Sequence, residues 1–303
     1  MLAAFISLIA AFGGGVLGAS IGALPAFIMT GVVAAAGGIL SCAGIPEISE
    51  LLVNNIAFGP FLGPHVCFAG GVAAAAYAKQ IGKTENGAED IALALNGLGD
   101  SLVLVVGGLF GMLGYIIAGI VNGLFALTPF YTDNPGCTVF ISAVIVRLLF
   151  GTRGMYSAPG SRRFLSKGSR LSNTLLLSFA YSLAVSGVYV ALALQGYASQ
   201  LGSYHIVIFG LAAIGLLFAE FGQAYFGWHH IGIISAEAVM CGWTCGLGAG
   251  ALILGIIFGV LAGIIGDIEG NLLNTDVDSH IDPPATAIFI CTILISIVYV
   301  ILG

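Results

Sequence analysis

One apolar stretch occurs twice in this chain and determines its expected fold. Residues 107–124 read GGLFGMLGYIIAGIVNGL, and residues 255–272 read GIIFGVLAGIIGDIEGNL. At this offset of 148 positions Gly107 and Gly111 fall on Gly255 and Gly259, and further along Pro135 and Thr138 fall on Pro283 and Thr286 without a gap. Two glycine-rich helices can align by chance, but a distant proline and threonine in register favour an internal repeat.

The composition places this repeat in a membrane. Hydrophobic residues make up 59% of the 303 residues and charged residues only 7%, whereas a soluble domain carries roughly 25% charged residues. Apolar stretches of about 20 residues recur along the chain, each long enough to cross a hydrocarbon core as a helix. These runs are continuous and lack the alternation of β-barrel strands. The sequence therefore predicts an all-α polytopic membrane protein without a soluble domain.

The hydrophobic pattern predicts about 10 transmembrane helices, and two stretches that look too broken to cross alone. The broken stretches lie at about 46–63 and 221–230. The helices are expected at about residues 2–22, 25–44, 64–80, 101–126, 136–151, 173–195, 204–221, 229–246, 249–268 and 285–302.

Three regions follow from this pattern. Residues 1–151 form a first transmembrane repeat, 152–172 a basic linker, and 173–303 a second repeat. Each repeat holds five crossings, and because five is odd, the two copies must enter the membrane in opposite directions. The expected fold is two inverted five-helix repeats, each with a re-entrant or broken segment, as in many secondary transporters. The extra residues of the first repeat, about 84–99, are interpreted as a cytoplasmic interfacial helix.

The basic residues orient the chain. All eight lie between Lys79 and Arg170, and six of them lie in or beside the linker. Positive charge stays on the cytoplasmic side, so the linker and the acidic 267–282 loop are predicted inside, with both termini and the 196–204 loop outside. We expect a multi-pass integral protein of the cell (inner) membrane. The second repeat has no Lys or Arg after Arg170 to orient it independently.

Prolines and glycines interrupt the apolar pattern in both repeats. Pro46 is suited to begin a short helix, and Pro60 and Pro64 are suited to end it. The second repeat has a comparable stretch, FGQAYFGWHH, at 221–230. Backbone that leaves a helix at membrane depth must be buried in protein or line a wet cavity. The two breaks are therefore expected to face each other near the midplane, where transporter sites lie.

Polar residues gather at these breaks. Glu237 gives the sharpest signal, because an ionisable side chain at membrane depth by default marks an ion path or substrate contact; His230 lies two turns away on roughly the same helical face. Alternatively, the asparagines and Gln223 only satisfy open carbonyl groups, and Glu220 only faces the headgroups. The candidate substrate or ion pathway comprises Asn54, Asn55, His65, Glu220, Gln223, His229, His230 and Glu237.

The sequence contains no established catalytic or metal-binding motif. The histidines, Glu237, Cys241 and Cys245 are competent metal ligands, but their spacing is not that of a known site, so no bound metal and no cofactor is expected. HExxH is absent, and the protein is not expected to be an enzyme. The acidic 267–282 loop lacks the pattern of an EF-hand and is expected to be solvated.

The predicted topology is similar to that of a known class of channels. Five crossings per repeat, a re-entrant segment before the third and an inverted second copy resemble the architecture of urea channels and, less closely, ammonium channels. The motifs of those channels are not visible in this sequence, so the resemblance implies no residue role, and a fold does not fix function. It implies, as an alternative, a channel-like facilitator for a small solute.

Titratable groups at the breaks favour an ion-coupled secondary transporter, with a proton or sodium ion bound at Glu237 or Glu220. Apart from Arg147, the spanning helices have no cation to neutralise an anion, so we expect a small neutral or cationic solute. A divalent metal transporter or a membrane enzyme is less favoured. The expected partners are this small-molecule or ion substrate and the lipid bilayer, without nucleic acid. Glycine- and alanine-rich faces make a homo-oligomer, a dimer or trimer, plausible.

Overall fold

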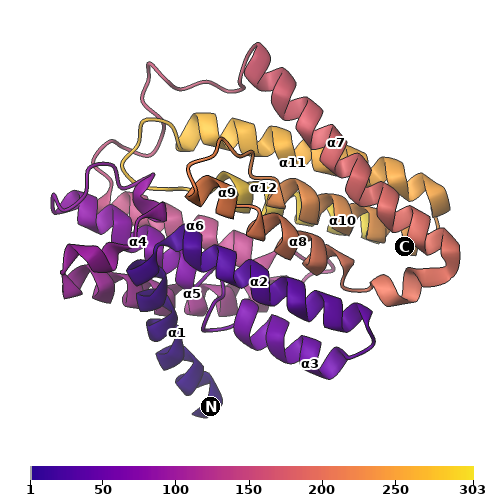
Figure 1. Cartoon of the computed structure of the whole chain (residues 1–303), viewed down its shortest axis with the longest axis horizontal. Helices are drawn as coiled ribbons and strands as arrows, with labels where there is room; N and C mark the ends of the chain where they lie inside the picture. Colours follow the sequence, from indigo (N-terminus) through magenta and orange to yellow (C-terminus); the bar gives the residue numbers. More distant parts are fainter. Residues whose placement is uncertain (1) are drawn as a thin grey trace.

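The computed structural model describes residues 2–303 and is all-helical, with no strand in that range (Figure 1). This confirms the expected all-α class. The α-helices are α1 (Leu2–Ile21), α2 (Ala23–Cys42), α3 (Pro46–Glu50), α4 (Cys67–Gln80), α5 (Ser101–Phe125), α6 (Asn134–Phe150), α7 (Ser169–Leu192), α8 (Tyr204–Ile214), α9 (Leu217–Glu220), α10 (His229–Thr244), α11 (Ala251–Leu273) and α12 (Pro283–Leu302). Short π- and 3-10 elements are η1 (Leu51–Ala57), η2 (Asp90–Ala92), η3 (Leu95–Leu98), η4 (Ala193–Tyr197), η5 (Ala198–Leu201) and η6 (Gly248–Gly250).

Six of these helices are long and apolar enough to cross a membrane: α1, α2, α5, α7, α11 and α12. Their outer faces carry large apolar side chains, such as Leu109 and Ile120 of α5, which are 54% and 56% exposed. Large apolar patches are rare on soluble monomers, whereas lipid solvates such a surface. This set of helices supports a membrane protein.

The other four predicted crossings are shorter. Helices α4, α6, α8 and α10 contain 14, 17, 11 and 16 residues. About 20 helical residues are typically needed to cross the hydrocarbon core, and each of the four is shorter than this. Each adjoins a stretch in which the helix is interrupted.

The first predicted break is present. Pro46 begins α3, the chain continues through the π-helical η1, and it leaves the helix over 58–66 before α4 begins at Cys67. The freed carbonyl oxygen of Leu62 accepts hydrogen bonds from Thr30 Oγ1 at 2.6 Å and from Cys67 Sγ at 3.1 Å. Side chains therefore satisfy the backbone that has left the helix, as membrane depth requires.

The second predicted break is also present. Helix α9 ends at Glu220, residues 223–228 have no regular structure, and α10 begins at His229. Gly222 has a φ of 73°, a left-handed conformation that glycine adopts readily and that commonly ends helices. The conformational freedom of Gly222 thus determines where the helix ends.

The insertion at 84–99 differs from the prediction. Instead of an interfacial α-helix it forms two 3-10 turns, η2 and η3. Gly87 and Gly99 have φ values of 77° and 63°, and left-handed residues interrupt a right-handed helix. A Cβ at Gly87 would also meet the backbone carbonyl of Asp278, so the insertion packs closely against the loop that follows α11.

Small residues form the seam between α7 and α11. Three serines of α7, spaced four residues apart, face three glycines of α11 with the same spacing, and a Cβ on any of these glycines would meet the facing serine oxygen. Lipid supplies no hydrophobic force between helices, so close packing of small residues is what holds such a seam. The pairs are Ser178 with Gly263, Ser182 with Gly259, and Ser186 with Gly255.

Glycines bring α1, α4 and α5 together in the same manner. A Cβ on Gly70 of α4 would lie 2.6 Å from the carbonyl oxygen of Gly107 on α5 and 2.7 Å from Cα of Gly15 on α1. These distances leave no room for a side chain, so the three helices meet at backbone contact.

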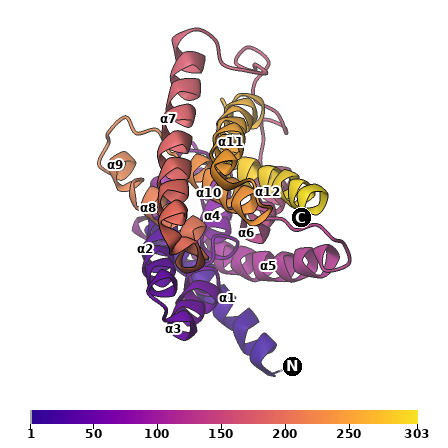
Figure 2. The same ribbon diagram turned by 90° about the vertical axis from the view of Figure 1, so that its right-hand side faces the viewer.

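The helices of the two halves pair in the same pattern. Helix α1 packs on α4 and α5, and α4 packs on α5 and α6; likewise α7 packs on α10 and α11, and α10 packs on α11 and α12. Between the halves, α2 packs on α8 and α6 packs on α12. Figure 1 shows α4, α5 and α6 on the left and α10 on the right, while Figure 2 shows α7 and α11 on the opposite side of the molecule from α1 and α3.

Gly259→Val should destabilise the protein, because the new side chain would overlap Ser182 and Ser235 where three helices meet. Overpacking costs roughly 1–3 kcal/mol, so we expect a lower unfolding midpoint, measured by size-exclusion chromatography of the detergent-solubilised protein after heating. Gly119→Val on α5 is the matched control, since a Cβ there meets nothing within 4 Å. Equal midpoints for the two variants would contradict the packing of this seam.

Candidate functional site

A cavity of about 550 Å³, the central cavity, lies between the two halves. Its wall combines residues of α2 and α6 with residues of α7, α8, α10, α11 and α12. The volume is within the usual range for small-molecule sites, roughly 300–1,000 Å³. The first turns of α6, α10 and α12 all contribute residues, so three helix N-termini meet at this cavity.

Four of the five phenylalanines that line the central cavity pack together on its apolar side. The ring centroid of Phe27 on α2 lies 5.9 Å from that of Phe68 and 5.5 Å from that of Phe209, and Phe58 lies 5.5 Å from Phe209. Favourable aromatic pairs have centroids roughly 4.5–7 Å apart. The rings therefore support one another as a continuous wall.

His229 and His230, the first two residues of α10, belong to the polar side. Each is only 6% exposed, and within residues 2–303 neither Nδ1 atom has a hydrogen-bond partner. A buried polar atom without a partner is costly, and it indicates a place that water or a ligand could serve. The His229 ring lies 5.1 Å from Phe27. Gly266 leaves space beside His230, since a Cβ there would lie 3.2 Å from Nε2.

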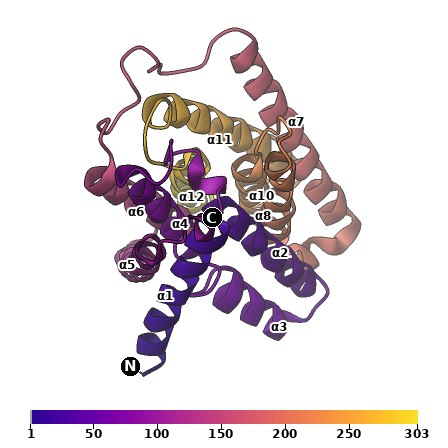
Figure 3. The same ribbon diagram turned by 60° about the vertical axis from the view of Figure 1, so that its left-hand side comes forward.

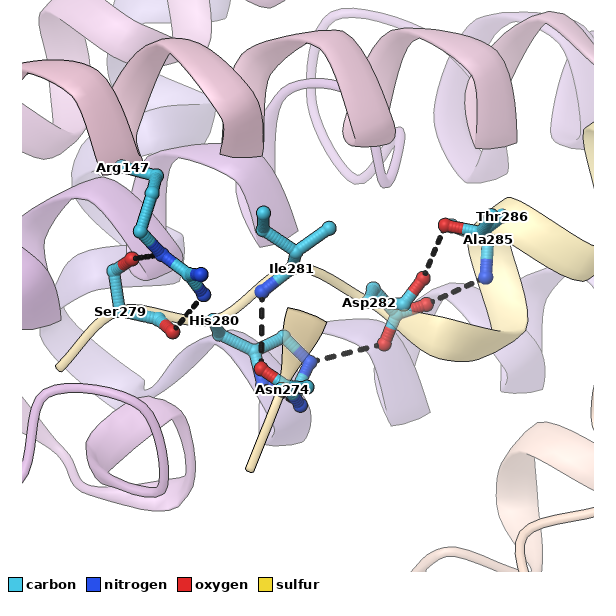
Figure 4. Close-up of polar contacts among 8 residues, drawn as sticks. All are labelled: Arg147, Asn274, Ser279, His280, Ile281, Asp282, Ala285 and Thr286. Atoms are coloured by element: carbon cyan, nitrogen blue, oxygen red, sulfur yellow. Dashed lines mark hydrogen bonds and ion pairs between the residues drawn. The ribbon is translucent and has the colours of Figure 1, made fainter. Parts of the chain in front are cut away.

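Two aspartates at the cavity cap the helices that begin there. Asp133 accepts a hydrogen bond from the Gly136 N–H of α6 at 2.5 Å, and Asp282 accepts one from the Ala285 N–H of α12 at 2.7 Å (Figure 4). Such caps satisfy free backbone donors and favour the positive end of the helix dipole. Both residues line the central cavity.

The two capped helices touch at equivalent positions. A Cβ on Gly136 would lie 3.0 Å from the Ala285 carbonyl oxygen, and the rings of Phe140 and Phe289 lie 5.4 Å apart. Both pairs, like the two caps, are separated by 149 positions. The sequence matches that aligned prolines at an offset of 148 are therefore one residue out of register here, because the caps fix where each helix starts.

Arg147 anchors the loop that carries this wall. It is 2% exposed, and its guanidinium donates hydrogen bonds to the Ser279 hydroxyl and to the carbonyl oxygens of Ser279 (2.7 Å), Leu273 (3.0 Å) and Met155 (2.7 Å). Figure 4 shows the Ser279 contacts. The five donors of arginine are well suited to join several acceptors at fixed angles. Arg147 thus ties the end of α6 to the end of α11 and to the loop after it.

The anchored loop positions His280 and Asp282. Asn274 accepts a hydrogen bond from the Ile281 N–H at 3.2 Å and contacts His280 Nδ1 at 3.2 Å (Figure 4). The other ring nitrogen of His280, Nε2, lies 3.1 Å from Asp282 Oδ1. The His280 ring also packs 6.0 Å from Phe68. The polar and aromatic sides of the cavity therefore join at His280.

The linker between α6 and α7 docks on the acidic region around this loop (Figure 3). Asp278 accepts hydrogen bonds from the backbone N–H at 2.8 Å and the hydroxyl of Thr152. Asp267 accepts them from the backbone N–H at 2.8 Å and the hydroxyl at 2.6 Å of Ser166. Burial raises the pKa of the Asp278 carboxyl, but the Thr152 hydrogen bonds and the Arg147 charge outweigh it and hold this pKa below its usual range.

The prediction that the 267–282 region is a solvated loop is therefore wrong for much of its length. Residues 267–273 continue α11, and Glu269 and Asp278 are only 4% and 3% exposed. The physical reason lies in tertiary contacts. The linker and Arg147 cover acidic residues that have no basic neighbours along the sequence.

A second cavity of about 650 Å³, the vestibule, adjoins the central cavity. It lies between the 84–99 insertion and the loop after α11, and four residues line both cavities: Leu24, Ile91, Asn274 and His280. The four shared residues form the boundary between the vestibule and the central cavity. His280 is the histidine among them.

Glu237 lies two turns beyond the histidines on α10 but is not part of the cavity wall. It accepts a hydrogen bond from Thr292 Oγ1 at 2.9 Å. Asp133, which does line the cavity, lies within its electrostatic range. Glu237 is thus a partly buried carboxylate just behind the wall.

The remaining predicted residues lie apart from the central cavity. Asn54 and Asn55 are exposed on η1, and Gln223 is exposed in the second break. Glu220 is half-buried at the end of α9, and His65 is buried before α4 without lining the cavity. Of the eight candidates, the structure brings His229 and His230 into the cavity wall and leaves Glu237 close behind it.

Several cavity residues were missed from the sequence. The caps had a detectable signal, because Asp133 and Asp282 stand directly before the proline-bearing first turns of α6 and α12, a known helix-start pattern. Glu269, which is buried near the end of α11 but does not line the cavity, had no such signal, since it appeared to belong to a loop. Its two carboxylate oxygens are buried without a hydrogen-bond partner within residues 2–303, and Arg147 lies within electrostatic range.

Among the described residues, 2–303, no group of three or more His, Cys, Asp or Glu is placed to hold a metal ion. Cys241 and Cys245 are free thiols. The chemistry of the central cavity is therefore that of imidazoles, carboxylates and aromatic rings.

A family model matches residues 1–164 and 178–302 of the chain. The chain belongs to DUF7973, a family of unknown function. No curated protein and no solved structure shows significant similarity to it. The matched stretches include every residue of the DUF7973 central cavity apart from Arg170, Asn173 and Thr174 at the start of α7.

Arg147→Lys should release the linker of the DUF7973 protein, because one ammonium group cannot reach the four acceptors that the guanidinium holds. A lost hydrogen bond to a charged group costs roughly 1.5–3 kcal/mol, so we expect at least about tenfold faster trypsin cleavage within residues 152–168. Arg163→Lys is the control: Arg163 is exposed, and the change keeps a trypsin site. Unchanged cleavage of the Arg147 variant would show that this residue does not anchor the linker.

Proposed function

We propose that this DUF7973 protein is an ion-coupled secondary transporter of a small neutral or cationic solute, which binds in the central cavity between two inverted repeats. The observation that carries the proposal is the cavity itself. Residues from both halves form its wall, three helices begin there, and two buried histidines have unsatisfied ring nitrogens. Transporter sites are typically built where broken helices of two repeats meet.

The pairing of the helices supports the inverted repeat. The contacts that α1, α4, α5 and α6 make with one another have counterparts among α7, α10, α11 and α12, and α2 with α8 and α6 with α12 pair across the boundary. A twofold relation between the halves accounts for equivalent residues of α6 and α12 touching each other.

Ten crossings also fit the structure when the broken segments are included. The path through α3, η1 and α4 then makes one crossing, as does the path through α8 and α9. Helices α6, α10 and α12 each begin beside the central cavity after an irregular segment. Irregular backbone at membrane depth is tolerated where it lines a cavity, and we place the central cavity at the midplane for this reason.

Contacts between loops support the proposed orientation of the second half. Ser161 donates a hydrogen bond to Asp276, and Thr152 donates to Asp278, so the basic linker and the acidic loop lie on the same side. Ser203, in the 196–204 loop, donates to Ser41 at the end of α2 at 2.7 Å. With the linker inside, this second group of loops lies outside, together with both termini.

Glu237 is the proposed site of the coupling proton or sodium ion. It lies behind the cavity wall, Asp133 is within its electrostatic range, and its hydrogen bond from Thr292 joins α10 to α12. A change of charge at Glu237 would alter how these two helices pack. Intramembrane carboxylates serve this role in many transporters.

Uptake into proteoliposomes tests coupling. For a panel of small neutral and ammonium solutes, we expect accumulation above equilibrium only with an imposed proton or sodium gradient. Glu237→Gln should reduce accumulation to the equilibrium level, because glutamine keeps the Thr292 contact but cannot ionise. Glu47→Gln, at an exposed acidic residue of α3, should behave as wild type. Gradient-independent equilibration that survives Glu237→Gln would instead indicate a channel-like facilitator.

Cysteine labelling tests the orientation. In a variant whose six native cysteines are replaced by alanine, Gln200→Cys should react with a membrane-impermeant maleimide in intact cells. Arg163→Cys and Asp276→Cys should react only after permeabilisation, and all three native residues are exposed. Labelling of Asp276→Cys but not Arg163→Cys from outside would contradict the contacts between the linker and the acidic loop. Labelling of both from outside would reverse the proposed orientation.

A further inference from the structure

Acidic side chains outnumber basic ones around the central cavity. Asp133, Asp267 and Asp282 are in its wall, whereas the basic member of the described wall is Arg170, which is exposed at the start of α7. The vestibule has the same balance, with Glu85, Glu89 and Asp276 against Arg153. A cleft lined with one sign of charge concentrates ions of the opposite sign. The route from the vestibule to the central cavity therefore favours cations.

Two of the three helix N-termini at the cavity do not reverse this preference, whereas the third, at the start of α10, has no side-chain cap. An uncapped helix N-terminus attracts anions, but Asp133 and Asp282 already occupy the ends of α6 and α12 and accept their backbone hydrogen bonds. An anion in the cavity would have to approach these two carboxylates. A cation would meet them without displacing either cap.

Asp282 is the carboxylate best placed to contact a ligand. About 18% of its side-chain surface remains accessible, while its cap and its His280 contact hold it in place. His280 packs against Phe68 on one side, and His229, which packs against Phe27, lies within electrostatic range of Asp282. Through these two histidines Asp282 adjoins the aromatic side of the cavity, where the ring centroids of Phe27 and Phe68 are 5.9 Å apart.

This combination favours an organic cation over a metal ion. Small metal ions need several oxygen, nitrogen or sulfur ligands, and no suitable group of three His, Cys, Asp or Glu exists within residues 2–303. Aromatic rings, by contrast, attract ammonium groups that carry alkyl substituents, through cation–π contacts within about 6 Å of the ring centroid. The cavity, at about 550 Å³, has room for such a molecule.

We propose that the central cavity binds an organic ammonium ion, with its nitrogen beside Asp282 and its alkyl groups against Phe27 and Phe68. This inference rests on the proposed transport function and names its substrate class. The vestibule concentrates the cation. The cation then passes His280 at the boundary between the two cavities. The aromatic wall and the carboxylate then replace the water that the ammonium group loses.

Calorimetric binding to the purified full-length protein tests this directly. The probes are tetramethylammonium, choline and tetraethylammonium, together with dimethylbutanol, the neutral carbon isostere of choline, and dimethylbutanoate, an anion of similar size. We expect saturable binding of at least one ammonium ion, and affinity for choline at least about tenfold above that for its isostere. Failure of all three ammonium ions to bind at millimolar concentration, or equal affinity for choline and its isostere, would overturn the proposal.

Matched variants locate the site. Asp282→Asn removes the charge but keeps a side chain that caps helices well, and it should weaken ammonium binding at least about tenfold. Asp100→Asn is the control, because Asp100 also caps a helix, through the Leu102 N–H at 3.0 Å, and lies outside both cavities. If Asp282→Asn does not fold, Phe27→Leu gives a second test: it should weaken choline binding more than isostere binding. Wild-type affinity in the folded Asp282 variant would refute the assignment.

The binding and uptake experiments can contradict the ligand class and coupled transport separately. Ammonium binding that depends on Asp282, without gradient-driven accumulation, would support the ligand class and contradict coupled transport. Gradient-driven accumulation of a neutral solute, without ammonium binding, would support transport and contradict the ligand class.

Discussion

Backbone groups released from a helix at membrane depth need partners, and this requirement shapes the whole molecule. Where the first half breaks, Thr30 and Cys67 bind the free carbonyl of Leu62. Where α6 and α12 begin, Asp133 and Asp282 bind the free N–H groups. Polar side chains in an otherwise apolar chain are thus located where helices are interrupted. Because three interrupted helices start at the same place, their polar groups gather around one cavity.

The sequence predicted the features of the fold that depend on local chemistry. Pro46 begins α3, and Gly222, with its left-handed backbone, follows the end of α9, so both residues mark helix boundaries that their own backbone preferences explain. Side-chain matches align the two stretches at an offset of 148, whereas the contacting pairs of α6 and α12 are separated by 149 positions, because Asp133 and Asp282 fix the helix starts. The two capping aspartates could be recognised from the sequence, because each stands before a first helical turn that contains proline. This pattern requires no knowledge of tertiary contacts.

Other features depend on contacts between distant segments and could not be read locally. Glu269 resembles a loop residue until Arg147 and the linker cover the end of α11. Asn54 and Asn55 lie on a π-helical segment, whose wider turn shifts side chains away from the face that an α-helical spacing assigns. Phe27 is one of many phenylalanines in apolar helices, and nothing in its neighbours marks it as a member of a binding wall. A cavity is a property of the assembled helices, so its apolar members leave no individual signal.

The 84–99 insertion has no counterpart in the second half, where only a short turn joins α10 to α11. It forms one wall of the vestibule, so the structure has a walled approach to the central cavity on the side of the basic linker. This single segment makes the two halves unequal, because it adds a chamber with a mainly acidic lining beside the central cavity on the linker side.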